Sequence, residues 1–138
     1  MNYTELAKRF LHNSHQFKSY GHHQKIEESM QGEIFVLFYV SRQNNFTLPS
    51  EIGAEMNISS ARVAAILNNL EKKGLITRQI DKSDRRKIIV ELTKKGSEKA
   101  EKHNQTVISL TAQMLESLGE QDAKELVRIT GRLAELAP

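Results

Sequence analysis

The apolar residues between positions 58 and 74 recur with the spacing of an α-helix. Four of them fall on one face of such a helix: Val63, Ile66, Leu67 and Leu70. Ser59 is a suitable N-cap residue, since its hydroxyl can accept a hydrogen bond from a backbone amide of the first turn. Gly74 follows the last periodic position, where a glycine commonly ends a helix. The pattern predicts an amphipathic helix over residues 59–73.

The spacing of apolar residues changes from helical to alternating directly after this helix. Residues 75–80 and 88–93 each alternate with a period of two, and they flank the polar segment 81–87. Two alternating runs around a short polar connection are typical of a β-hairpin. The pattern predicts two short strands with a basic tip.

Two more helices are expected before this stretch. Residues 29–45 include a segment that is apolar on nearly all sides, which favours a central helix. A second helix over residues 48–56 has Pro49 in its first turn, a favourable position for proline, and Asn57 can end it in a left-handed conformation. This helix, the tight turn and helix 59–73 predict a helix-turn-helix.

The two ends of the chain carry amphipathic helices with little to pack against. One is expected over residues 3–20, a long one from Thr93 to about Leu118, and a last one after Gly119. A single winged-helix lobe offers these apolar faces too small a surface. We therefore expect them to pair with a second copy of the chain.

These elements define the expected fold as mainly α with a small two-stranded β wing. The chain is interpreted as one winged helix-turn-helix unit of 138 residues, with a DNA-binding lobe over residues 29–93. Residues 1–21 and 94–138 form the expected helical dimerisation region.

Positive charge is concentrated where the predicted helix and wing meet. Residues 59–96 contain ten lysines and arginines and four acids, a net +6, whereas the whole chain carries +3. A charge run alone is often only a solvated face, but here it coincides with a helix and a hairpin. Neutralisation of phosphates explains such a concentration, so double-stranded DNA is the expected partner.

The N-terminal part of helix 59–73 is expected to lie in the major groove. Arg62 can bind guanine O6 and N7, Asn68 can pair with adenine N6 and N7, and Ala65 is small enough for close approach or simply favours the helix. The cations assigned to phosphates are Lys72, Lys73, Arg78, Lys82 and Lys87. The candidate DNA-binding residues are Ser59, Ser60, Ala61, Arg62, Ala65, Asn68, Asn69, Lys72, Lys73, Arg78, Lys82, Asp84, Arg85, Arg86 and Lys87.

Composition excludes several other classes of protein. The chain has no cysteine, so disulfides and thiolate metal sites are impossible. It contains no phosphate-binding glycine loop and no common hydrolase motif, so no enzyme activity and no cofactor are expected. No apolar run is long enough to span a membrane and no signal peptide is visible. A cytoplasmic protein without a membrane partner is expected.

Four histidines gather near the N-terminus: His12, His15, His22 and His23. His12 and His15 are three residues apart, a spacing that metal ligands can use. The cluster lacks a clear carboxylate partner, so a polar helix face followed by a loop is the favoured interpretation. A metal-responsive regulator remains an alternative.

The stretch from Leu70 to Gly96 resembles the multiple-antibiotic-resistance regulator (MarR) family. That family shows L-E-x-x-G-L-[IV]-x-R, then D-x-x-D-[RK]-R, then L-T-x-x-G, and the chain has these elements at 70–78, 81–86 and 92–96. The resemblance implies a homodimeric transcriptional regulator, in the first place a repressor, that binds an inverted-repeat operator and is released by a small ligand. The chain departs from the pattern at Ala65, where many members carry an arginine.

The resemblance also assigns roles within the wing and at a ligand site. It implies that Arg86 enters the minor groove and that Asp84 braces it, although Arg85 is an alternative. It further implies a pocket between the DNA-binding lobe and the helical base for a small aromatic or phenolic ligand. The candidate lining residues are Phe17, Tyr20, His22, Phe38 and Arg42. The competing class is a winged-helix protein-interaction module, which has no need for the basic run 85–87.

Overall fold

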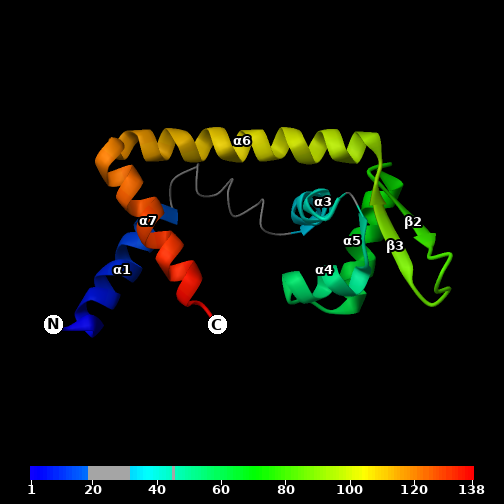
Figure 1. Ribbon diagram of the computed structural model, residues 1–138, viewed down its shortest axis with the longest axis horizontal. Helices are drawn as coiled ribbons and strands as arrows, with labels where there is room; N and C mark the ends of the chain where they lie inside the picture. The colour runs from blue at the N-terminus through cyan, green and yellow to red at the C-terminus, as the bar shows by residue number, and fades with distance from the viewer. Residues whose placement is uncertain (19–31, 45) are drawn as a thin grey trace.

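The computed structural model describes residues 1–18, 32–44 and 46–138. It is mainly α, with a long helix that joins a compact lobe to the C-terminal helix (Figure 1). The described helices are α1 (Tyr3–Lys18), α3 (Gly32–Arg42), α4 (Pro49–Met56), α5 (Ser60–Lys72), α6 (Lys94–Leu118) and α7 (Glu120–Leu136). The strands are β1 (Phe46–Thr47), β2 (Ile76–Ile80) and β3 (Ile88–Leu92).

The predicted helix-turn-helix is confirmed. Helix α4 begins at Pro49 and ends at Met56, and its C-cap residue Asn57 is left-handed, with a φ of 54° and a ψ of 50°. Helix α5 starts after Ser59, whose hydroxyl accepts a hydrogen bond of 3.2 Å from the backbone amide of Arg62. Gly74 adopts a φ of 73° after the last turn of α5. Local sequence signals therefore set both ends of the turn.

The sheet has one strand more than the predicted two-stranded wing. Strands β2 and β3 form the expected antiparallel hairpin, with Ile76 opposite Leu92 and Ile80 opposite Ile88. The additional strand β1 pairs with β3, so the sheet order is β1-β3-β2. A strand of two residues is too short to show alternation, which is why the sequence did not reveal it.

A single cluster of apolar side chains forms the core of the lobe. Helix α3 lies at its centre, as its apolar composition predicts, and contributes Val36 and Val40 with no exposed surface. The buried hydrophobic residues are Val36, Leu37, Val40, Ile52, Val63, Ile66, Leu67, Leu70, Leu75, Ile76, Val90 and Ala100. The buried face of α5 is the predicted one, so its other face is left for binding.

The long helix α6 is joined to the lobe at its first turn. The hydroxyl of Thr93 accepts a hydrogen bond of 3.1 Å from the Gly96 amide and donates one of 2.7 Å to the Gly74 carbonyl oxygen. The Thr93 amide donates to the Leu75 carbonyl oxygen at 3.1 Å, and Lys95 Nζ donates to the Lys73 carbonyl oxygen at 3.2 Å. The start of α6 thus satisfies carbonyl groups of the three residues that follow α5.

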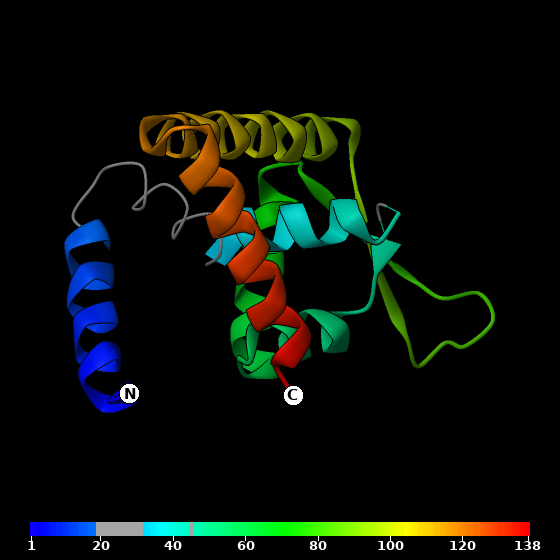
Figure 2. The same ribbon diagram turned by 60° about the vertical axis from the view of Figure 1, so that its left-hand side comes forward.

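The terminal helices expose their apolar faces. None of the residues of α7 is buried, and Leu133 is 59% exposed. Helix α1 exposes Phe10 to 65% and stands apart from α7 (Figure 2). Among the described residues, no helix combines the length and the apolarity needed to cross a membrane.

Candidate nucleic-acid interface

The face of α5 opposite the core is exposed to solvent. Every candidate residue on this helix and at its cap is exposed, whereas the apolar residues between them are buried. The exposed candidates are Ser59, Ser60, Ala61, Arg62, Ala65, Asn68, Asn69 and Lys72. An α-helix with an exposed face of this kind can enter the major groove of DNA.

The cations along α5 differ in how much of their charge is compensated. Arg62 and Lys72 form no ion pair with any described residue. Lys73 Nζ instead lies 2.6 Å from the Glu33 carboxylate at the start of α3. The charge of Lys73 is therefore partly balanced, and its assignment to a phosphate remains a prediction.

Arg78 on strand β2 is also paired within the protein. Its Nε and Nη2 donate to the two carboxylate oxygens of Glu71 at 3.3 and 3.1 Å, and Nη2 donates to Asn68 Oδ1 at 2.7 Å. The hydrogen bonds from Arg78 lower the pKa of the Glu71 carboxyl group, and those to Glu71 raise the pKa of Arg78. The sequence assigned Arg78 to a phosphate, but its guanidinium group faces α5.

The wing tip is a hydrogen-bonded turn that carries exposed cations. The Asp81 amide donates to the Lys87 carbonyl oxygen at 2.9 Å, which closes the hairpin. Asp84 Oδ1 accepts hydrogen bonds from the Arg86 amide and from Arg86 Nε at 3.1 and 3.2 Å. These bonds lower the pKa of the Asp84 carboxyl group.

The expected ion pair between Asp84 and Arg86 is thus present at the tip. The Arg86 side chain is nevertheless 91% exposed, and Lys82 and Arg85 beside it are exposed as well. The pair holds the Nε edge of the Arg86 guanidinium group, while most of the side chain stays accessible to DNA. Which arginine enters a groove remains a prediction.

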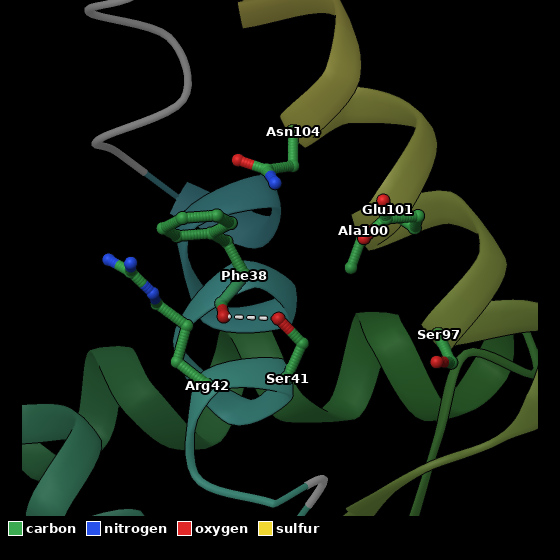
Figure 3. Close-up of a pocket in the computed structure, with 7 residues that line it drawn as sticks. All are labelled: Phe38, Ser41, Arg42, Ser97, Ala100, Glu101 and Asn104. Atoms are coloured by element: carbon green, nitrogen blue, oxygen red, sulfur yellow. Dashed lines mark hydrogen bonds between the residues drawn. The ribbon is translucent and has the colours of Figure 1, made fainter. Parts of the chain in front are cut away.

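A cavity of about 410 Å³ lies between α3 and α6, where the lobe meets the long helix (Figure 3). Two of the predicted lining residues, Phe38 and Arg42, border it, and the Arg42 guanidinium lies over the Phe38 ring at 5.0 Å. Phe17 on α1 does not line this cavity, and Tyr20 and His22 lie outside the described residues.

The remaining lining residues were not predicted from the sequence. Most belong to one face of α6: Ser97, Ala100, Glu101 and Asn104, with Ser41 from α3. Their spacing of three and four residues is a helical stripe that includes polar side chains. The sequence shows this polar stripe on α6, but only the packing of α6 against α3 makes it one wall of the cavity.

The N-terminal histidines are only partly described. His12 and His15 are exposed on α1, and His22 and His23 lie outside the described residues. Within the described ranges, no group of three histidine or carboxylate side chains could hold a metal ion.

An exposed helix-turn-helix face beside a basic hairpin wing defines a winged helix-turn-helix, a fold that DNA-binding transcriptional regulators use. The MarR family model matches residues 30–87, which cover most of the lobe. The repressor MdtR of Bacillus subtilis is 30% identical over 105 residues, which are 76% of this chain and 67% of MdtR. The chain therefore belongs to the MarR family.

Other relatives agree with this assignment. The transcriptional repressor YetL of Bacillus subtilis is 24% identical over 75% of this chain, and the match spans only 61% of YetL. The crystal structure of YusO from the same organism superposes with a TM-score of 0.69 at 26% identity, covering 97% of this chain and 94% of YusO. BpsR of Bordetella bronchiseptica, whose DNA binding is regulated by 6-hydroxynicotinic acid, shares the fold at a TM-score of 0.67 and 20% identity, with 99% of both chains covered.

MdtR and YetL are both helix-turn-helix transcriptional repressors. The function of these relatives and the exposed face of α5 both indicate a DNA-binding regulator.

Proposed function

We propose that this protein represses transcription by binding an inverted-repeat operator as a homodimer. One observation carries the proposal: the exposed face of α5 and the wing beside it each present exposed cations. These cations form no ion pair with a described residue. Arg62 and Lys72 lie along α5, and Lys82 and Arg85 lie on the wing. A helix in the major groove with a wing at the next minor groove uses both sets at once.

The terminal helices supply the second part of the proposal. The exposed apolar faces of α1 and α7 belong to the predicted dimerisation region, residues 1–21 and 94–138. Apolar helix faces that stay exposed in a single chain are typical of an interface with a partner. A two-fold dimer reads two half-sites whose centres lie about one helical turn, or roughly 10 base pairs, apart.

The test is selection of DNA from a random library by the full chain. We expect one inverted repeat to be enriched, and we expect its affinity to fall steeply with salt because phosphate contacts release counterions. The measurement is fluorescence anisotropy on the selected and on scrambled DNA between about 50 and 200 mM salt, the range over which such contacts are diagnostic. Equal, weak binding to both DNAs would instead favour a protein-interaction module.

We further propose that the cavity between α3 and α6 is the effector site. Arg42 can pair with a carboxylate, the Phe38 ring offers an aromatic surface, and Glu101 can accept a hydrogen bond from a hydroxyl group. A small aromatic acid that carries a hydroxyl group fits these three features. BpsR responds to a compound of this chemistry, which supports the same class for this protein.

The wing provides a prediction that separates groove insertion from simple charge attraction. We expect Arg86→Ala to weaken binding about tenfold or more on A·T-flanked operators, as loss of a charged hydrogen bond would. The loss should be smaller on G·C-flanked operators, because the narrow A·T-rich minor groove attracts an inserted arginine most strongly. Anisotropy titrations on the two operators measure the difference.

Two matched variants complete this experiment. Arg85→Ala removes the neighbouring exposed arginine and should weaken both operators equally. Asp84→Asn should reproduce part of the Arg86→Ala loss, because a neutral amide oxygen holds Arg86 Nε less strongly than the Asp84 carboxylate does. Net charge alone predicts tighter binding for Asp84→Asn. Tighter binding together with no flank dependence would contradict insertion of Arg86.

A further inference from the structure

A three-residue cluster connects the exposed face of α5 to the first strand of the wing. Arg78 Nη2 donates to Asn68 Oδ1 at 2.7 Å, and the Arg78 guanidinium forms a fork with both carboxylate oxygens of Glu71. We propose that Arg78 and Glu71 are positioning residues for base recognition, which hold the Asn68 amide with its oxygen toward the protein and its nitrogen toward DNA. This inference rests on the proposed function.

The backbone that carries Arg78 is fixed by the core. Arg78 lies opposite Val90 in the β2–β3 ladder, and both Val90 and Ile76 are fully buried. The Arg78 side chain is 27% exposed, compared with 91% for Arg86 at the wing tip. Arg78 is therefore held at a defined place beside α5, whereas Arg86 extends into solvent.

The fork with Glu71 fixes the plane of the guanidinium group. Two parallel hydrogen bonds between an arginine and a carboxylate define the orientation of both groups. Asn68 and Glu71 are three residues apart on α5, so their side chains lie on the same face of the helix. A guanidinium held by Glu71 consequently presents Nη2 to the Asn68 oxygen in one orientation.

The charge of Arg78 is compensated inside this cluster. Lys72 and Lys82 differ from Arg78, because they form no ion pair with any described residue. Glu71 balances the charge of Arg78 at 3.1 Å. Removing both members of the pair leaves the net charge unchanged, which allows positioning to be separated from electrostatics.

The orientation of the amide determines which base edges Asn68 can read. The bidentate contact with adenine needs the amide oxygen to accept from N6 while the nitrogen donates to N7. Since Asn68 Oδ1 already accepts from Arg78, that contact would compete with the cluster. The outward nitrogen is a donor, which suits acceptors such as guanine O6 and N7 or thymine O4 and is mismatched with the cytosine amino group.

The experiment uses the operator that the wild-type chain selects from a random library. Dissociation constants are measured for all four base pairs at each position of a half-site. Asn68→Ala should reduce discrimination at one position by about threefold to tenfold, the effect of one hydrogen bond. In the wild-type protein, binding at that position should be weakest when cytosine stands on the contacted strand.

The double variant Glu71→Gln/Arg78→Gln tests the role of the pair. We expect it to reduce discrimination at the same position as Asn68→Ala and to leave the slope of log K against log salt unchanged. Adding Asn68→Ala to the double variant should cause no further loss there. Lys82→Gln is the matched control, since loss of a phosphate contact should weaken all sequences alike and make the slope shallower by about 0.9.

Arg78→Lys keeps the charge and cannot form the fork, so it should also reduce discrimination at that position. Circular-dichroism melting of each variant verifies that the lobe is folded. Full discrimination in the double variant would overturn the inference, as would a salt slope in the double variant that is as shallow as that of Lys82→Gln. Selection of no sequence by the wild-type chain would overturn the proposed function itself.

Discussion

Gly96→Ala should lower the free energy of unfolding by about 3 kcal/mol, the upper end of the range for overpacked sites. A Cβ atom on Gly96 would lie 1.9 Å from the Leu75 carbonyl oxygen and 2.9 Å from the Leu75 carbonyl carbon. Both atoms belong to the backbone, so no side-chain rotation can relieve the overlap. Urea unfolding followed by circular dichroism measures the loss.

Gly96→Ala should affect DNA binding as well as stability, because Gly96 lies where α6 packs against the lobe. The Leu75 carbonyl oxygen also accepts the hydrogen bond from the Thr93 amide, and Thr93 caps α6. Moving Leu75 away from a new methyl group therefore disturbs the contact that couples α5 to the long helix. We expect DNA affinity to fall together with stability.

Gly131→Ala is the matched control for this substitution. Gly131 lies within α7, and no atom of the described residues outside its own helix backbone lies within 4 Å of the Cβ position. The spacing of an α-helix places it on the face opposite Leu133 and Ile129. Alanine is the better helix former, so the change should raise stability by about 0.5–1 kcal/mol. A Gly96→Ala variant as stable as Gly131→Ala would contradict the close contact at Leu75.

Leu133→Glu should separate the proposed dimer and reduce operator affinity about 100-fold or more, the gain that linked binding sites usually provide. Leu133 is 59% exposed in the single chain, so the substitution removes no contact of the lobe core. A carboxylate in the middle of a paired apolar face would be desolvated without a partner. Sedimentation velocity and anisotropy on the complete operator measure the two effects.

The control is Gln121→Glu, which adds the same charge on another face of α7. Gln121 is exposed, and helical spacing turns it about 120° away from Leu133. This variant should remain dimeric and keep its operator affinity. Binding to a single half-site should differ little between the two variants, because the recognition face is unchanged in both. A Leu133→Glu protein that stays dimeric at micromolar concentration would exclude α7 from the interface.

Local sequence signals were sufficient to predict the helix-turn-helix and its boundaries. Ser59 caps α5, Asn57 ends α4 in a left-handed conformation and Thr93 caps α6, as their positions in the pattern predicted. These features depend on hydrogen bonds and conformational preferences within a few residues. Periodicity also predicted which face of α5 is buried, since that face follows from side-chain polarity alone.

Contacts between residues far apart in the chain arise only from the packing of the elements. Arg78 was assigned to a phosphate because it is a cation in a basic segment, yet the hairpin brings it back to Glu71 and Asn68, seven and ten residues earlier. Lys73 likewise meets Glu33, which is forty residues away in the chain. Residue type and local spacing carry no information about such pairs.

The same limit explains strand β1, the cavity wall on α6 and the role of Gly96. Two residues cannot display a strand period, yet Thr47 is held in the sheet by its pairing with Val90. The stripe that contains Glu101 becomes part of a cavity only because α6 lies across α3. In the sequence, Gly96 is an ordinary residue of a helix, and only the structure shows that the Leu75 carbonyl group leaves no room for a Cβ atom there. Local patterns thus determine elements and their faces, whereas contacts between elements are determined by the packing of the core.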